Sequence, residues 1–120
     1  MEFSFKKEFP NPNDRIAEWN QIQKDYPDYI PIVCEKDPKS KSTLTLSKKK
    51  FIVPPTLNMS QFGMLIRNKL KARQDEAIFF LVNGEKAIPG STPLSEVYNN
   101  YKDPDDGLLY IMFSTEVLWG

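Results

Sequence analysis

The chain has 120 residues, of which 40% are hydrophobic and 27% are charged. These values are typical of one soluble globular domain that folds without metals or disulfides. The sequence contains no histidine and one cysteine, Cys34, so it lacks the commonest general base, the commonest transition-metal ligand and any internal disulfide. An enzyme is therefore the least favoured class of protein. Cys34 lies in an apolar run and is interpreted as a buried, inert thiol in preference to a nucleophile.

Apolar runs are all shorter than the roughly 20 residues that a membrane-spanning helix requires. The first residues also lack the apolar stretch that a signal peptide contains. The cytoplasm is therefore the expected location.

Charge is distributed unevenly, although the formal net charge is zero. Residues 36–73 contain ten basic side chains and one acidic side chain, whereas the segments on either side are acidic. A basic segment of this kind attracts anionic partners such as acidic peptides, lipid headgroups or nucleic acid. The alternative is a solvated face that the acidic segments balance in space. Nucleic acid is not favoured, because the lysines lack the interleaved aromatic residues of a stacking surface.

The N-terminal region is predicted to be helical. Residues 3–9 form a short helix or an extended arm, and Asn11-Pro12 marks the start of the next helix. That helix is predicted from Arg15 to about Asp25, and Pro27 ends it. Apolar residues recur along it at steps of three and four, which indicates one buried stripe made of Ile16, Trp19, Ile22 and Tyr26.

The middle of the chain predicts a hairpin followed by a helix. Strands are expected at 29–36 and 49–53, joined by a polar loop. Asn58 is a plausible cap for a helix that runs to about Lys71. Its inward face consists of Met59, Phe62, Ile66 and Leu70.

The last part of the chain predicts two strands around a helix. The continuously apolar run 77–82 is expected to be a central strand, buried on both faces. Thr92 is predicted to cap a helix, and 108–113 form a last strand. The inward side chains of that helix are Leu94, Val97, Tyr98 and Tyr101. The whole order of elements indicates an α+β, two-layer domain with a β-grasp sheet.

Short motifs along nearly the whole chain carry a family resemblance. They are Tyr26-Pro27-Asp28, Ile30–Lys36, Lys48–Pro54, Gln61-Phe62, Leu65-Ile66-Arg67, Ala77–Phe80, Val82-Asn83, Leu109-Tyr110 and Trp119-Gly120. Together, and in this order, they resemble the GABARAP family of autophagy ubiquitin-like modifiers. The resemblance implies a ubiquitin-like β-grasp fold, with a four-stranded mixed sheet and packed helices, preceded by two short N-terminal helices. It divides a single domain into a helical extension (1–26), a β-grasp core (27–114) and a flexible conjugation tail (115–120).

The resemblance also implies a function. Gly120 would be joined to phosphatidylethanolamine by ubiquitin-like activating and conjugating enzymes, with a cysteine protease for processing or deconjugation. No other cofactor and no metal is expected. The protein, a monomer before conjugation, would act in the cytoplasm and on autophagosomal membranes, where it would recruit cargo receptors and autophagy machinery through short aromatic-x-x-aliphatic peptides. The alternative is a peptide-binding ubiquitin-like adaptor that is never conjugated.

The expected peptide site is the edge strand at 49–53, to which a peptide would add as a further strand. Since side chains alternate along a strand, Lys50 and Ile52 point to one side, and Phe51 and Val53 to the other. A helical projection places Phe62, Leu65 and Lys69 on one strip, a possible groove wall. The alternatives are that the edge lysines prevent aggregation and that Phe62 and Leu65 are core residues.

The family pattern assigns residues to the two sides of this edge. For the aromatic pocket it implies Glu18, Ile22, Pro31, Lys50, Ile52 and Leu108. For the aliphatic pocket it implies Phe51, Val53, Pro54, Leu57, Phe62 and Leu65. The electrostatic rim, which would favour acidic flanks on a peptide, consists of Lys48, Arg67 and Lys69.

Three features depart from the family pattern. Tyr29 stands where many relatives carry a basic residue, which weakens the expected recognition of acidic flanks. Gly107 and Leu108 replace an aromatic pair, so a roomier aromatic pocket is expected. Trp19 has no aromatic counterpart in the family pattern.

Overall fold

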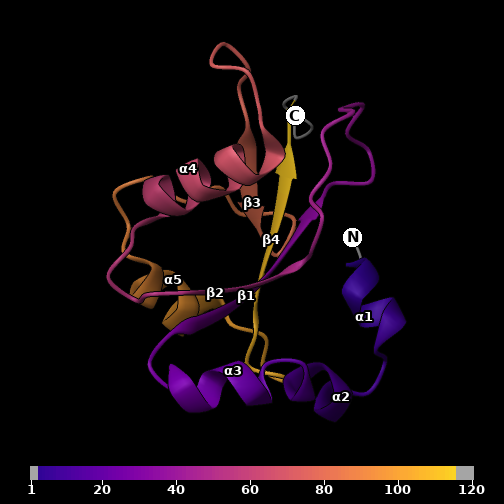
Figure 1. The fold of residues 1–120 in the computed structure, drawn as a ribbon, viewed down its shortest axis with the longest axis vertical. Helices are drawn as coiled ribbons and strands as arrows, with labels where there is room; N and C mark the ends of the chain where they lie inside the picture. Colours follow the sequence, from indigo (N-terminus) through magenta and orange to yellow (C-terminus); the bar gives the residue numbers. More distant parts are fainter. Residues whose placement is uncertain (1–2, 116–120) are drawn as a thin grey trace.

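A four-stranded mixed sheet forms the centre of the molecule, in the strand order β2-β1-β4-β3 (Figure 1). The computed structural model describes residues 3–115. β1 runs antiparallel to β2 and parallel to β4, and β4 runs antiparallel to β3. The strands are β1 (Ile30–Lys36), β2 (Lys50–Val53), β3 (Phe79–Val82) and β4 (Leu109–Ser114). The α+β, β-grasp interpretation is therefore confirmed.

β3 lies at an edge of the sheet, so the prediction of a central strand at 77–82 is wrong. The buried central strands are β1 and β4, and both Phe79 and Phe80 are only half-buried. An apolar run does not distinguish the middle of a sheet from an edge that a helix covers. Here the ring of Phe80 packs against Phe62 of helix α4 (Met59–Leu70), with centroids 6.1 Å apart.

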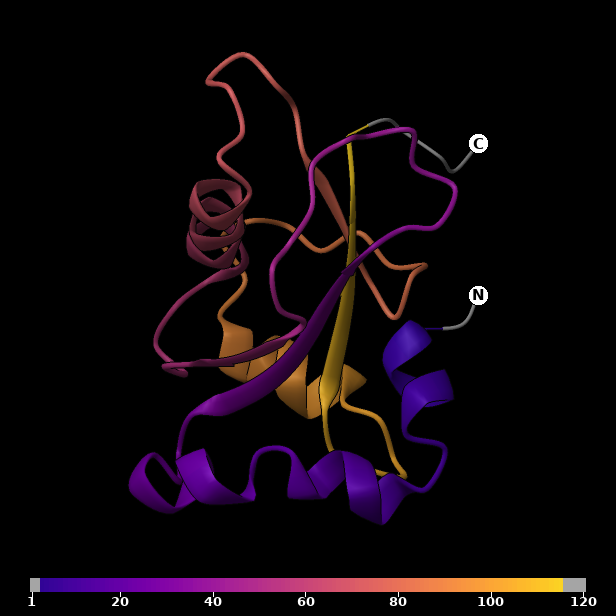
Figure 2. The ribbon, with the colours of Figure 1, turned by 45° about the vertical axis from the view of Figure 1, so that its right-hand side comes forward.

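Helices α4 and α5 (Leu94–Tyr101) pack on one face of the sheet (Figure 2). α4 begins with a reciprocal capping box, in which Asn58 Oδ1 accepts from Gln61 N (2.8 Å) and Gln61 Oε1 accepts from Asn58 N (2.9 Å). All four side chains predicted to face inward from α4 are buried. The predicted cap of α5 is wrong, because Pro93 occupies that position and the carbonyl of Thr92 accepts from Met59 N.

Three short helices precede the sheet, where the sequence predicted two: α1 (Ser4–Glu8), α2 (Pro12–Ala17) and α3 (Asn20–Asp25). The predicted second helix is interrupted at Glu18 and Trp19, whose amides bond to carbonyls three residues back. This tighter turn rotates the residues that follow it. The predicted apolar stripe is therefore not buried as a unit: Trp19 is buried, whereas Ile16, Ile22 and Tyr26 are exposed.

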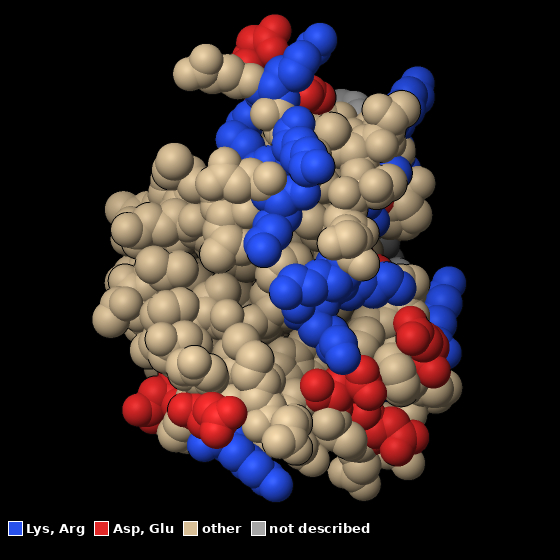
Figure 3. Space-filling model, in the orientation of Figure 1, with Lys and Arg blue, Asp and Glu red and all other residues tan. Residues whose placement is uncertain are grey.

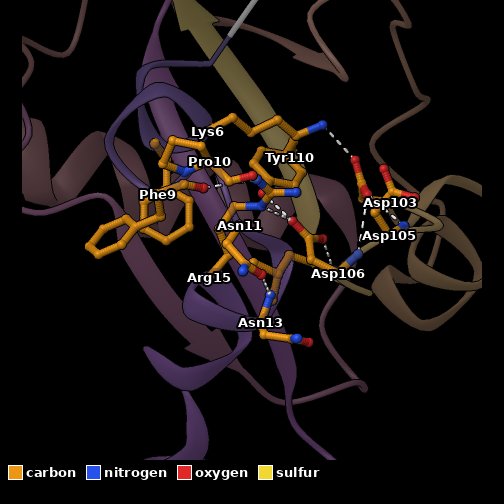
Figure 4. Close-up of polar contacts among 12 residues, drawn as sticks. Lys6, Phe9, Pro10, Asn11, Asn13, Arg15, Asp103, Asp105, Asp106 and Tyr110 are labelled. Atoms are coloured by element: carbon orange, nitrogen blue, oxygen red, sulfur yellow. Dashed lines mark hydrogen bonds and ion pairs between the residues drawn. The ribbon is translucent and has the colours of Figure 1, made fainter.

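The N-terminal helices are held to the second face of the sheet by packing and by buried polar contacts. Phe3, Phe5 and Trp19 join a second apolar cluster with side chains of β1 and β4. The Glu35 carboxylate accepts from the backbone N–H groups of Ser4 and Phe5, which satisfies free donors at the start of α1. Figure 4 shows the contacts of Arg15 and Lys6 with the turn before β4.

Candidate functional site

The outer edge of β2 presents backbone groups that no strand among residues 3–115 pairs with. Cys34 N donates to Lys49 O over 2.9 Å, so Lys49 and every second residue after it face β1. In an antiparallel ladder the intervening residues turn their backbone groups the other way. Lys50 and Ile52 therefore direct their N–H and C=O groups outward, where another strand can bond to them.

The side chains of β2 alternate between the two apolar clusters. Phe51 and Val53 belong to the core cluster beneath α4. Ile52 packs against the second cluster, on the side of the N-terminal helices. β2 thus separates two apolar regions, as its alternating pattern predicted.

One groove crosses this edge strand, with a volume of about 410 Å³. One wall comes from the α2–α3 segment, the centre from β2 and the other wall from α4. Its lining residues are Glu18, Trp19, Ile22, Lys48, Lys50, Phe51, Ile52, Val53, Leu65 and Lys69. Basic side chains form a band over this face of the molecule (Figure 3).

The charged residues of the groove are only partly engaged. Lys50 Nζ forms an ion pair with Glu18 Oε1 at 2.8 Å; the Lys50 side chain is exposed and the Glu18 side chain is partly exposed. Lys48 Nζ lies 5.3 Å from the centre of the Phe51 ring. Asp37, the one acidic residue of the basic segment, is buried and accepts a bond from Lys39 N. The exposed surface of that segment is therefore basic throughout.

Most of the predicted site residues meet in this groove. From the aromatic set the structure brings together Glu18, Ile22, Lys50 and Ile52; from the aliphatic set Phe51, Val53 and Leu65; from the rim Lys48 and Lys69.

Six predicted residues do not line the groove. Pro31 and Leu108 are buried, and Pro54 and Leu57 are half-buried outside the lining. Phe62 faces the core with no exposed surface, because α4 turns its Met59–Leu70 stripe directly onto the sheet. Arg67 is engaged elsewhere, since its guanidinium donates to the carbonyls of Arg73 and Glu76 in the loop after α4.

Trp19 lines the groove but was not assigned to it from the sequence. Its helical spacing placed it on an apolar stripe, which is correct as far as burial is concerned. A signal was available in the sequence: Trp19 is a large aromatic residue, and it directly follows Glu18, which was assigned to the site. The break between α2 and α3 that turns Trp19 toward β2 has no local signature of that kind.

Three further features of residues 3–115 concern a reactive cysteine, a metal site and a membrane-spanning helix. Cys34 is fully buried, and burial together with the neighbouring Glu35 charge raises its pKa, which agrees with an inert thiol. Within that same range there is no group of three or more His, Cys, Asp or Glu placed to hold a metal ion. None of the helices described is long and apolar enough to span a bilayer.

The strand order, the helix α4 across the sheet and the groove at the β2 edge together define a ubiquitin-like domain with a groove across its edge strand. The family model described as "Autophagy protein Atg8 ubiquitin like" matches residues 14–120. The chain therefore belongs to the Atg8 family of ubiquitin-like autophagy proteins.

Individual relatives agree with this assignment. Autophagy-related protein 8 of Coccidioides immitis is 41% identical over 120 residues, covering 100% of this chain and 99% of the relative. The protein of the same name from Aspergillus niger is 40% identical, with 100% and 98% covered. The crystal structure of Trypanosoma brucei ATG8 superposes with a TM-score of 0.86 at 29% identity, covering all of both chains.

Proposed function

We propose that this autophagy protein is conjugated through Gly120 to phosphatidylethanolamine and that it recruits receptors through the groove at β2. The groove supports the second part of this proposal, the recruitment of receptors. Its open backbone edge at Lys50 and Ile52 offers main-chain bonds to an extended peptide, and its apolar regions lie on opposite sides of the strand. Two anchor side chains three residues apart in an extended peptide also point to opposite sides.

Weak binding is expected for each peptide. Burial of one aromatic and one aliphatic anchor contributes roughly 4–5 kcal/mol before the costs of association, so micromolar-type affinity requires the main-chain bonds and the charged contacts as well. The three lysines of the groove, Lys48, Lys50 and Lys69, favour acidic residues beside the anchors. Titration of the full chain with an acidic-flanked Phe-x-x-Leu peptide tests this, and its diagnostic control is the same peptide with both anchors replaced by alanine.

Conjugation is supported by the family resemblance and by the glycine at position 120, which lies outside the described residues. A glycine has no side chain to obstruct an activating enzyme, and the two acyl chains of the lipid suffice for stable anchoring. The expected partners are ubiquitin-like activating and conjugating enzymes and a deconjugating cysteine protease, and the expected locations are the cytoplasm and autophagosomal membranes.

Mass spectrometry of the protein from starved cells tests the conjugation. A phosphatidylethanolamine adduct on Gly120 is expected, and Gly120→Ala should abolish it. The competing function is that of a peptide-binding adaptor that is never conjugated. It would be favoured by a free carboxylate under all conditions and by full function of the Gly120→Ala variant.

A further inference from the structure

Trp19 is held in place by contacts on two sides. The residue is 2% exposed, yet it contributes to the groove lining. The indole Nε1 donates a hydrogen bond to the carbonyl oxygen of Phe51 over 3.2 Å. The ring also meets Phe5 of α1 edge to face, with centroids 5.5 Å apart. The indole is therefore held both by the strand that forms the groove and by the helix behind it.

Trp19 borders the side of the groove to which Ile22 and Ile52 belong. Pro31 and Leu108 were assigned to this side from the family pattern, but both are buried and lie outside the groove lining. Leu108 lies in the same apolar cluster as Trp19, and Ile52 packs against that cluster. The indole therefore packs in the cluster on the side of the groove where the family pattern placed the aromatic pocket. The roomier pocket expected from the sequence stays a prediction.

We infer that Trp19 is the specificity-determining residue of the groove: its fixed indole limits the depth available between Ile22 and Ile52, so the groove selects a phenylalanine-sized first anchor over tryptophan. This inference rests on the proposed binding of aromatic-x-x-aliphatic peptides. A larger anchor must displace the indole, which breaks its bond to Phe51 and its contact with Phe5, or distort the surrounding packing.

Two peptides that differ only at the first anchor, Phe-x-x-Leu and Trp-x-x-Leu, test this by calorimetric titration of the full chain. The wild-type protein is expected to bind the Phe peptide at least about fivefold more tightly, as is usual for overpacking by one larger ring. In Trp19→Ala the preference should reverse, because the vacated volume accommodates the larger anchor.

Trp19→Phe is the second variant, because Trp19→Ala also removes packing from a buried cluster. It keeps an aromatic ring beside Phe5 but loses the indole N–H and part of the bulk. We expect the two peptides to bind this variant with similar affinities. Thermal unfolding of each variant identifies any loss of structure.

Fluorescence gives a direct readout of contact. The chain contains two tryptophans, so a Trp119→Phe background, excited at a wavelength that tyrosine does not absorb, leaves Trp19 as the one tryptophan that emits. Binding of the Phe peptide, which has no tryptophan, should change the Trp19 emission.

The outcomes separate the two proposals. If both peptides bind but their affinity ratio is the same in the wild type and both folded variants, Trp19 does not determine specificity while peptide binding stands. An unchanged Trp19 emission on binding would also contradict the inference. If neither peptide binds any form of the protein, both the proposed peptide binding and the inference about Trp19 are wrong.

Discussion

Arg15 and Asp106 form a buried ion pair in which Arg15 Nε donates to Asp106 Oδ2 over 2.7 Å (Figure 4). Their side chains are only 5% and 0% exposed. Tyr110 donates its hydroxyl to the same oxygen over 2.5 Å, and Arg15 Nη1 also donates to the carbonyls of Phe9 and Pro10. The pair therefore joins the N-terminal helices to the turn that precedes β4.

Removal of the Asp106 carboxylate should strongly destabilise the folded protein. Asp106→Ala leaves the Arg15 guanidinium buried without its counter-charge, and such changes cost about 3–5 kcal/mol of unfolding free energy. Equilibrium unfolding in urea measures this. Asp105→Ala is the matched control, because Asp105 is exposed and should change the stability by less than about 0.5 kcal/mol. Equal effects of the two substitutions would contradict the buried pair.

The attachment of α1 should depend on pH through Asp103, which binds Lys6 Nζ at 2.6 Å. Burial acts to raise the pKa of Asp103, but hydrogen bonds from Lys6 and from the Asp105 and Asp106 amides outweigh it and lower the pKa below 3.8. A carboxylate with a depressed folded-state pKa stabilises the fold above its unfolded-state value. That contribution is therefore present above about pH 4 and is lost as the pH falls through the folded-state pKa.

Lys6→Met should weaken this acid dependence. At neutral pH the substitution is expected to cost less than about 1 kcal/mol, since the pair is partly exposed. Urea unfolding from neutral pH into the acid range should show a shallower loss of stability than in the wild type. Lys7→Met is the control, because Lys7 is exposed on the same helix. Identical acid profiles for Lys6→Met and wild type would rule out this source of pH dependence.

The α4 wall of the groove can be tested at Leu65, which lies in the lining and is only half-buried. Leu65→Ala removes apolar surface from the aliphatic side and should weaken peptide binding about tenfold or more. Met64→Ala is the matched control, because the neighbouring Met64 is 63% exposed and lines a different cavity. If the two variants bind the peptide equally well, Leu65 is not part of the binding surface.

Substitution of Phe62 tests whether this residue belongs to the core or, as the family pattern implies, to the groove. Its ring is fully buried and meets Phe80, so Phe62→Leu should lower the unfolding free energy by about 1 kcal/mol. Peptide affinity of the folded variant should be unchanged. A loss of affinity with unchanged stability would instead support the groove assignment.

Local signals allowed much of the fold to be predicted. α4 was predicted to within a residue at its end, because the Asn58 cap and the buried stripe are encoded in neighbouring positions. The separation of Phe51 from Lys50 and Ile52 followed from the period of a strand alone. Both features depend on residues close in sequence, so no knowledge of the tertiary structure was required.

The errors arose where distant contacts decide the outcome. The edge position of β3 depends on β4 inserting beside β1, which the apolar run at 77–82 does not encode. Similarly, the turn that buries Trp19 and exposes Ile22 depends on the indole reaching the Phe51 carbonyl, 32 residues later. Phe62 and Leu65 share a helical strip, and only the angle of α4 on the sheet determines that one is buried and the other borders the groove.

The open edge of β2 has a consequence for avidity. The edge is formed within the folded sheet, so a peptide that adds to it requires no prior opening of the domain, and one edge accepts one strand. Under the proposed function, each copy of the protein would hold a single motif weakly. A partner with several motifs would be retained by the high effective concentration of neighbouring copies on one surface. Retention would then depend on how densely the protein covers that surface, so a sparse coating would release partners that a dense one keeps.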